Sequence, residues 1–197
     1  MLVLDIDGTI FKKDYTASDR VKNTLQRLSD DGIKVVLCTG RMYAATKCIA
    51  QELGLTTPVI CYQGGLVKDF NNNDTTLLED TMDVELARDV INELKKRKLF
   101  FNLYINDVLM VEEDHELIRQ YVDARNISYK VVGNCDNIDL TGVNKILAID
   151  DNTTLIEDLQ KELAKKYEGK LYVIRSTPRF CEFSSPSATR KCSALPC

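Results

Sequence analysis

Hydrophobic and polar positions along the first 67 residues follow two periods in turn, which predicts strands that alternate with helices. Short apolar runs at residues 2–5, 34–38 and 58–62 are typical of buried strands. Between them, apolar side chains recur at helical spacing before a glycine: Val21, Leu25 and Leu28 before Gly32, and Ala45, Cys48, Ile49 and Leu53 before Gly54. The pattern predicts two strand–helix units, and therefore parallel strands joined by crossover helices.

The pattern changes after the polar segment at residues 71–74, where we expect the approach to a domain boundary near Thr81. A helical face at residues 84–94 follows, and the alternation at residues 101–106 predicts a half-buried strand. Asn106 and Asp107 should turn the chain into the next strand. The remaining predicted elements are a helix on residues 117–122, strands near 128–132 and 143–149, a helix on 155–163, and strands at 171–175 and 180–183. This order indicates an α+β layer.

The composition restricts the class of protein and of partner. Of 197 residues, 44% are hydrophobic and 28% are charged, with a formal net charge of -4, which is typical of a folded globular protein. A net negative surface has no electrostatic attraction to nucleic acid or to an anionic membrane, so we expect neither as a partner. Apolar stretches are short and Met1 leads directly into a strand, so the expected location is the cytoplasm. The seven cysteines lack CxxC spacing and are expected to be reduced and mostly structural.

Two carboxylates stand two positions apart in the segment DIDGT, residues 5–9, at the predicted carboxyl end of the first strand. Open α/β sheets bind their ligands at that edge. Asp5 can attack phosphorus, while Asp7 can protonate the leaving oxygen and later deprotonate water. Anions this close to each other and to a phosphate favour a bound Mg²⁺, and the N–H groups of Gly8 and Thr9 can donate to phosphate oxygens. The alternative is that Asp7 and Gly8 only form a turn.

The segment CTGR, residues 38–41, follows the second predicted strand and should lie beside Asp5 in a parallel sheet. Thr39 and the N–H groups after it can donate to a phosphoryl oxygen at the start of the next helix. Considered alone, Thr39 as a helix N-cap with Gly40 in a tight turn explains the segment better. The predicted position beside DIDGT favours phosphate binding, with Arg41 as a further contact for the substrate or for the second domain.

DIDGT resembles motif one and CTGR resembles motif two of the haloacid dehalogenase superfamily of aspartate-nucleophile phosphatases. The α+β insert after CYQGG is similar to the cap of the Cof-type members. The resemblance implies an α/β fold with a Rossmann-like parallel-sheet core at residues 1–80, an inserted α+β cap domain at residues 81–183 and a return to the core at residues 184–197. It also implies that Lys191, at the position of motif three, neutralises the nucleophile and the phosphate. By spacing alone, Lys191 is only a solvated lysine.

The chain stops at Cys197, before the acidic loop that forms motif four in this superfamily, so we expect a C-terminally truncated core. Mg²⁺ would then depend mainly on Asp5, the Asp7 backbone carbonyl and water, a small ligand set for an ion that requires octahedral geometry. The truncation would also leave the strand before Asp5 at the edge of the sheet. An exposed apolar edge predicts a homodimer formed through that edge.

Two further segments are explained without catalysis. AIDDNTT, residues 148–154, superficially resembles motif four but precedes Lys191, and Asp151 or Asn152 can serve there as a helix N-cap. The lone His115 lies among acidic residues at a predicted helix start and is expected to be solvated.

These features predict a Mg²⁺-dependent phosphatase that hydrolyses small phosphorylated metabolites through an aspartyl-phosphate on Asp5. The resemblance makes sugar phosphates the expected substrate class. One alternative is a catalytically impaired fragment, or a phosphometabolite-binding protein, that lacks the full metal site. A phosphomutase, which returns the phosphoryl group to a sugar, would use the same Asp5 and Asp7.

Overall fold

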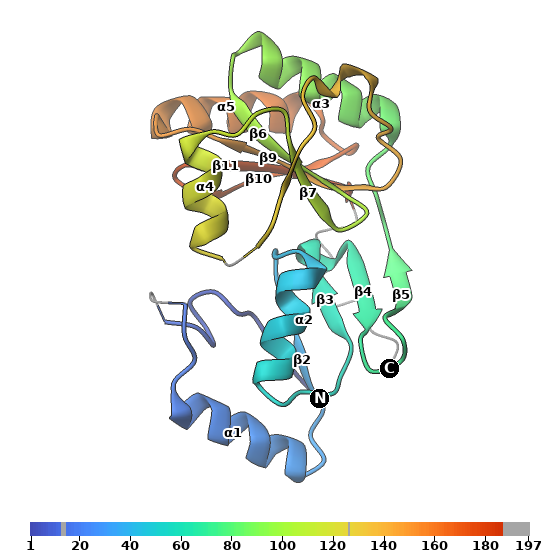
Figure 1. The fold of residues 1–197 in the computed structure, drawn as a ribbon, viewed down its shortest axis with the longest axis vertical. Coiled ribbons are helices and arrows are strands. Elements are labelled where there is room, and N and C mark those ends of the chain that lie inside the picture. The colour runs from blue at the N-terminus through green and yellow to red at the C-terminus, as the bar shows by residue number, and fades with distance from the viewer. Residues whose placement is uncertain (13–14, 126, 187–197) are drawn as a thin grey trace. The chain divides into compact units, whose positions relative to one another are not determined.

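The computed structural model describes residues 1–12, 15–125 and 127–186 (Figure 1). Within this part of the chain, two compact units divide between Glu79 and Asp80. Each unit contains helices and a set of strands of its own, and the assignment of the second unit as a cap stays a prediction.

The first unit begins with parallel strands, as the sequence predicted. Strand β1 (Leu2–Leu4) pairs in parallel with β2 (Val35–Leu37), and helix α1 (Asp19–Asp30) connects them. Helix α2 (Tyr43–Glu52) leads from β2 to β3 (Val59–Cys61), which joins β2 through a parallel bridge between Cys38 and Ile60. The prediction of a parallel α/β core is therefore confirmed.

Local signals account for the ends of the first two helices. The Ser18 side chain accepts a hydrogen bond from the Val21 N–H and caps α1, and Gly32 follows with a φ of 79° that favours glycine. The buried residues of α2 are Tyr43, Thr46, Ile49 and Ala50. Cys48, which we expected on the buried face, is exposed because that face is rotated away from it.

The first unit also contains a hairpin that the sequence pattern did not predict. After a 3-10 turn, η1 (Tyr62–Gly64), β4 (Leu66–Asp69) pairs antiparallel with both β3 and β5 (Thr75–Glu79). The segment at residues 71–74 is thus the turn of a hairpin. All five residues of β5 are exposed, so the strand lacks the apolar alternation by which a sequence reveals a strand.

The second unit is built on one six-stranded sheet with the order β10-β11-β9-β6-β7-β8. Its pairs are antiparallel except for β7 with β8. The strands are β6 (Phe100–Ile105), β7 (Val108–Val111), β8 (Lys130–Val131), β9 (Val143–Ile149), β10 (Tyr172–Thr177) and β11 (Phe180–Ser184). The helices are α3 (Val84–Lys96), α4 (Glu116–Asp123) and α5 (Thr153–Lys166), with a short η2 (Cys135–Asn137).

Two helices cover one face of this sheet. Helices α3 and α5 lie side by side in Figure 1, and their apolar residues form one core with alternate residues of the sheet. The opposite face carries α4, because the Tyr121 hydroxyl on α4 bonds to the Tyr104 hydroxyl on β6 at 2.7 Å. Both faces of β6 are therefore covered. The prediction that β6 is half-buried is wrong, since Asn102 and Tyr104 are buried together with their apolar neighbours.

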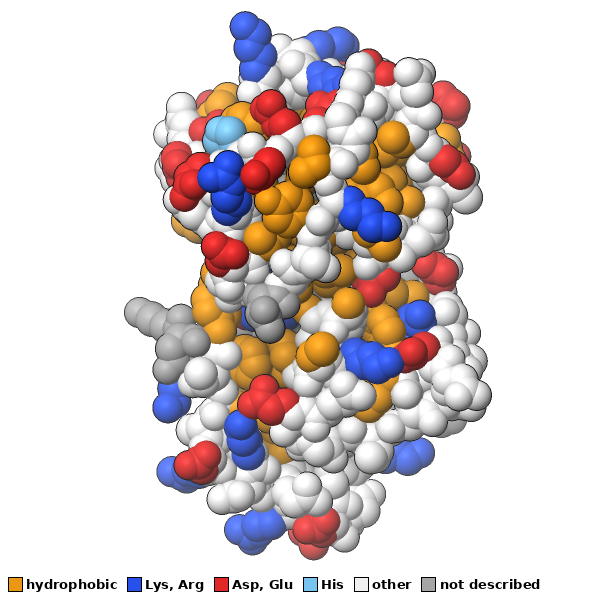
Figure 2. All heavy atoms as spheres, in the orientation of Figure 1, with side chains coloured by type: hydrophobic (Ala, Val, Ile, Leu, Met, Phe, Trp, Pro, Cys, Tyr) orange, Lys and Arg blue, Asp and Glu red, His pale blue; other side chains and the backbone are white. Residues whose placement is uncertain are grey.

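Other local predictions can be compared with the structure directly. The Asn152 side chain accepts from the Leu155 N–H at 3.1 Å and caps α5, so the structural explanation of AIDDNTT is confirmed. Of the cysteines in the described residues, all five are free and four are buried. None of the helices in the described part of the chain has both the length and the apolar character that a bilayer crossing requires. On the face drawn in Figure 2, basic and acidic side chains are interspersed.

Candidate functional site

The two predicted motifs follow neighbouring parallel strands. Leu4 is paired with Leu37, so Asp5 and Cys38 begin the two loops at the same edge of the sheet. The Cys38 N–H donates to the Leu4 carbonyl at 2.8 Å and holds the starts of the loops together. DIDGT and CTGR therefore meet at the carboxyl edge, where open α/β sheets bind ligands.

The loop after β1 is organised around one buried backbone carbonyl. Ile6 is fully buried, and its carbonyl accepts hydrogen bonds from the N–H groups of Thr9, Ile10 and Phe11. Gly8 has a φ of 77°, and open space surrounds the position of a Cβ there. Asp7, Gly8 and Thr9 are exposed while Asp5 is half-buried, so the loop presents its polar groups to solvent.

In the loop after β2, Thr39 is buried and does not cap a helix. Its Oγ1 accepts from the Arg41 N–H at 3.2 Å, and its own N–H donates to the Ile60 carbonyl at 2.9 Å. Helix α2 begins four residues later, and its N-cap is Met42, which makes no side-chain cap bond. The N-cap interpretation of Thr39 is therefore wrong, and so is the expectation that Thr39 stands at the start of the helix.

Arg41 connects the second loop to the first. Its Nε donates to Oδ2 of Asp7 at 2.9 Å and its Nη2 donates to Oδ1 at 2.6 Å. The guanidinium also lies 5.5 Å from the ring centre of Phe11 and 5.6 Å from that of Tyr15. The Arg41 side chain is 10% exposed and that of Asp7 is 48% exposed, so the arginine is the anchored partner. The planar guanidinium of Arg41 contacts both oxygens of Asp7, and this two-point contact fixes the direction of the Asp7 carboxylate.

A third loop, after β3, was not predicted to belong to the site. The Tyr62 N–H donates to the Arg41 carbonyl at 3.1 Å, and the Gln63 N–H donates to the Thr39 carbonyl at 2.9 Å. Tyr62 and Gln63 have φ values of 48° and 58°, a conformation that residues other than glycine rarely adopt. A Cβ on Gly40 would lie 3.2 Å from Nε2 of Gln63, so Gly40 allows the two loops to pack closely. The two glycines that follow Gln63 in the sequence could have indicated a tight turn at this edge of the sheet.

The donors of the first unit suit Mg²⁺ in kind. Asp5 and Asp7 offer hard oxygen ligands. Among the described residues, the one cluster of three or more acidic, Cys or His groups that approach closely enough to hold an ion lies elsewhere, in the second unit. Asp5 and Asp7 are thus a suitable but partial ligand set. Lys191 lies outside the described residues.

His115 differs from the expectation of a solvated side chain. It is half-buried, its Nδ1 accepts from the Leu117 N–H at 3.2 Å, and it serves as the N-cap of α4. Its ring stacks on Phe100 with ring centres 3.7 Å apart. The acidic residues beside His115 in the sequence indicated a solvated position. The packing depends on Phe100, which belongs to a strand earlier in the chain.

Comparison with known proteins is consistent with this geometry. Residues 2–196 match the family described as haloacid dehalogenase-like hydrolase. The chain is 28% identical over 169 residues to the Bacillus subtilis 5-amino-6-(5-phospho-D-ribitylamino)uracil phosphatase YitU, covering 83% of this chain and 57% of that protein. It is 30% identical over 112 residues to the Escherichia coli pyridoxal phosphate phosphatase YbhA, covering 57% of this chain and 41% of that protein.

A solved structure shares the fold. The crystal structure of a Thermotoga maritima protein has a TM-score of 0.79 at 27% identity, and the match covers 93% of this chain and 68% of that chain. The chain spans about half the length of the two curated relatives named above. The family match extends over nearly all of the chain, and the two motifs lie together as the resemblance implied. The chain belongs to the haloacid dehalogenase-like hydrolase family.

Proposed function

We propose that this protein is a phosphoric monoester hydrolase that forms an aspartyl-phosphate on Asp5. The observation that supports the proposal is the meeting of the DIDGT and CTGR loops at one sheet edge, where Arg41 holds Asp7 two residues from Asp5. A nucleophile on the strand end beside an oriented second carboxylate is the arrangement that this two-step chemistry requires.

In the first proposed step, a carboxylate oxygen of Asp5 attacks phosphorus, and the bond from phosphorus to the ester oxygen breaks. Asp7 donates its proton to the departing alkoxide, which leaves as an alcohol. In the second step, Asp7 accepts a proton from water, and the resulting oxygen attacks the phosphorus of the aspartyl-phosphate. The bond between phosphorus and Asp5 breaks, and inorganic phosphate is released with both carboxyl groups restored.

The remaining residues of the two loops have supporting roles in this proposal. The exposed Gly8 offers its N–H group to a phosphoryl oxygen, whereas the Thr9 N–H already donates to the Ile6 carbonyl, and Gly40 lets the second loop approach closely. Thr39 and Arg41 shape that loop, and Arg41 directs Asp7. Lys191 is the proposed positive charge beside the phosphate. A bound Mg²⁺, held by Asp5 and by Asp7 or its backbone, would neutralise charge that develops on the phosphoryl group.

Small phosphorylated metabolites are the proposed substrates, with sugar phosphates as the class to test first. The names of the relatives add phosphoribitylamino-uracil and pyridoxal phosphate as candidates, since both are phosphate esters of a primary alcohol next to a ring or polyol. Self-association through the free side of β1 remains part of the proposal for partners, because within the described residues β1 pairs only with β2.

Turnover of p-nitrophenyl phosphate by the full chain, with and without Mg²⁺, tests the reaction. Asp5→Asn preserves size and should lower kcat at least 10³-fold, on the order expected for loss of a nucleophile. Asp31→Asn, a change at an exposed residue after α1, is the matched control and should leave turnover unchanged. Activity that survives Asp5→Asn would contradict the assignment of the nucleophile.

The binding-protein alternative gives a different outcome. The wild-type chain would then bind a phosphate ester, as measured by isothermal titration calorimetry, without producing inorganic phosphate. For a hydrolase, borohydride reduction of the acid-quenched reaction should convert Asp5 to homoserine, because it traps the acyl phosphate. A phosphomutase would instead transfer a ³²P-labelled phosphoryl group from a phosphorylated donor to a sugar. Each function therefore leaves a distinct product.

A further inference from the structure

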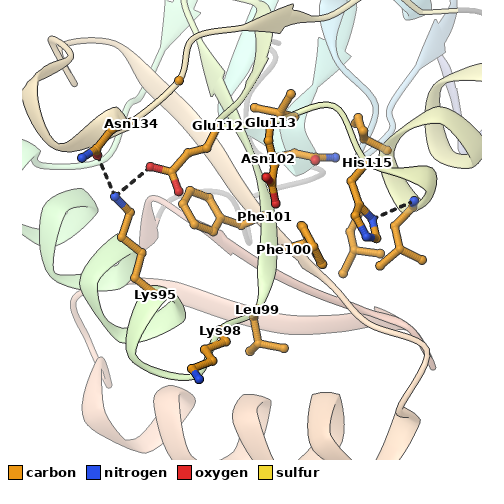
Figure 3. A pocket seen from close by; sticks show the side chains of 15 residues that line it. Lys95, Lys98, Leu99, Phe100, Phe101, Asn102, Glu112, Glu113, His115 and Asn134 are labelled. Atoms are coloured by element: carbon orange, nitrogen blue, oxygen red, sulfur yellow. Dashed lines mark hydrogen bonds and ion pairs between the residues drawn. The ribbon is translucent and has the colours of Figure 1, made fainter.

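The second unit contains a cavity of about 640 Å³, and its wall is partly polar. Figure 3 shows Lys95 between Asn134 and Glu112, and its Nζ lies 3.1 Å from Oδ1 of Asn134 and 2.7 Å from the Glu112 carboxylate. His115, on another wall, accepts from the backbone of α4 through Nδ1. These contacts account for Lys95, Glu112 and His115 without a ligand, so the cavity does not identify one.

In the first unit, a tight turn after β3 holds the CTGR loop from the side. Tyr62 and Gln63 form this turn and are buried, at 1% and 9% exposure. The Tyr62 N–H donates to the Arg41 carbonyl at 3.1 Å, and the Gln63 N–H donates to the Thr39 carbonyl at 2.9 Å. The turn is therefore bonded to both ends of the segment at residues 39–41.

The backbone of this turn is strained at two consecutive residues. Tyr62 has a φ of 48°, and Gln63 has a φ of 58° and a ψ of 25°. In this left-handed conformation a Cβ crowds the carbonyl oxygen that follows it, whereas glycine adopts it without strain. Strain of this kind is retained where the surrounding structure depends on the residue. The presence of glutamine at this φ therefore indicates that its side chain has a role that glycine could not fill.

The Gln63 side chain covers Gly40, the central residue of the segment at residues 39–41. A Cβ on Gly40 would lie 3.2 Å from Nε2, 3.3 Å from Cγ and 3.7 Å from Cδ of Gln63. Three side-chain atoms at such distances mean that the glutamine lies flat against the glycine backbone. The backbone and the side chain of Gln63 thus restrain the same three residues, and close packing leaves them little room to shift.

This restraint reaches the Asp7 carboxylate through Arg41. The Arg41 N–H donates to Oγ1 of Thr39 at 3.2 Å, and the Arg41 guanidinium bonds to both oxygens of Asp7. Arg41 is thus held at its carbonyl by Tyr62, at its N–H by Thr39 and at its side chain by Asp7. A shift of the segment at residues 39–41 would move the base of the Arg41 side chain, and the guanidinium would then direct Asp7 differently.

We propose that Gln63 is a positioning residue for the hydrolysis, because it fixes the segment at residues 39–41 and acts through Arg41 on the direction of the Asp7 carboxylate. The inference rests on the proposed function, in which Asp7 transfers protons in both steps. Gln63 acts without touching the phosphoryl group: its side chain packs on Gly40, and Arg41 carries the effect to Asp7. Proton transfer depends strongly on such alignment, so the turn affects the rate more than the binding of substrate.

Turnover of p-nitrophenyl phosphate by the full chain with Mg²⁺ tests this role. Gln63→Gly removes the side chain but suits the positive φ, and kcat should fall about tenfold with a smaller change in KM. Gln63→Asn keeps an amide on a residue that tolerates the left-handed conformation, so kcat should fall less. Asn73→Gly is the matched control, because Asn73 has a φ of 51° but is exposed in the turn between β4 and β5. Its kcat should equal that of the wild type.

A double-mutant cycle identifies the route of the effect. If Gln63 acts through Arg41, Gln63→Gly should change kcat by less than about threefold in an Arg41→Lys background, where the two-point contact with Asp7 is already lost. A purely structural role predicts another result: a lower free energy of unfolding in urea, with the kcat of each folded molecule unchanged.

The Nε–H of Arg41 gives a readout that does not require turnover. In ¹⁵N NMR spectra of the wild-type chain, this proton should exchange slowly with solvent because it donates to Asp7. Gln63→Gly should accelerate the exchange about fivefold or more, whereas Asn73→Gly should not.

The two proposals fail in different ways. Turnover that is absent from the wild type, or that persists in Asp5→Asn, would contradict the hydrolase, and the Arg41 signal would still decide whether Gln63 holds the loop. The positioning role would be overturned if Gln63→Gly left kcat and the Arg41 exchange unchanged. It would also be overturned if the effects of Gln63→Gly and Arg41→Lys on kcat multiplied in the double variant.

Discussion

The guanidinium of Arg41 bonds to both carboxylate oxygens of Asp7, at 2.9 Å and 2.6 Å. The pair joins the loops that follow β1 and β2, so the direction of the Asp7 carboxylate depends on a residue 34 positions later in the chain. A planar, two-point contact of this kind specifies orientation as well as charge.

Replacing Arg41 should therefore affect turnover more than substrate affinity. Arg41→Lys keeps the charge but cannot form the fork, and we expect kcat for p-nitrophenyl phosphate to fall about tenfold, with Arg41→Ala lower still. KM should change less, because the two variants alter the direction of the Asp7 carboxylate. Arg27→Lys, on the exposed last turn of α1, is the control. An unchanged kcat in Arg41→Lys, or an equal change in kcat and KM, would contradict a positioning role.

Close packing between the second and third loops predicts a specific coupling. In Gly40→Ala, the new Cβ would lie 3.2 Å from Nε2 and 3.3 Å from Cγ of Gln63, so the glutamine must shift. We expect unfolding to become easier by about 1 kcal/mol in urea denaturation. Gln63→Gly removes the contact and suits the positive φ, so Gly40→Ala should cost little in that background. Equal costs in both backgrounds would show that the two residues are not coupled.

The ion pairs of α3 predict a loss of stability in acid. The Arg97 and Lys96 side chains lower the pKa of Glu93 from its ordinary 4.5 to about 2, against the effect of burial. Since the folded pKa lies below the unfolded one, the stabilisation is complete above about pH 4.5 and is lost as the pH falls towards 2. Glu93→Gln should lower the free energy of unfolding by about 1–2 kcal/mol at pH 7. The difference from wild type should shrink between pH 4.5 and 2.

Urea titrations at several pH values measure this difference. Glu85→Gln removes the same charge from the first turn of α3 and is the control, because no ion pair of Glu85 is present among the described residues. A difference between wild type and Glu93→Gln that stays constant down to pH 2 would show that Arg97 and Lys96 do not stabilise the Glu93 carboxylate.

Two buried asparagines of the second unit should respond oppositely to the same substitution. Asn144 accepts the Asp107 N–H at 3.2 Å, so Asn144→Leu should reduce the free energy of unfolding by about 1–2 kcal/mol. Asn102→Leu removes a donor without a partner among the described residues, so its stability should be equal to wild type or greater. Thermal denaturation monitored by circular dichroism compares them. A larger loss for Asn102→Leu would show that its amide is satisfied in the unliganded protein.

The sequence pattern predicted the elements that bury an apolar face, and missed those that do not. Strands β2 and β3 were predicted because all of their residues are buried and form short apolar runs, and α2 was predicted because its apolar residues recur at helical spacing. The residues of β5 are all exposed, so the strand has no buried apolar face, and it was not predicted. The alternation of Asn102 and Tyr104 with apolar residues predicted a solvent-exposed face of β6. Both residues are buried because α4 covers that face, and a contact between distant segments cannot be predicted from alternation.

The sequence by itself determined the candidate chemistry, since the carboxylates of Asp5 and Asp7 and the loops that carry them are local features of short segments. Tertiary structure decided which side chains meet. The parallel register of Leu4 with Leu37 brings Arg41 to Asp7, and the bridge from Cys38 to Ile60 brings Gln63 to Gly40. These contacts depend on pairing between strands far apart in the chain, whereas periodicity and motifs report only the surroundings of each segment.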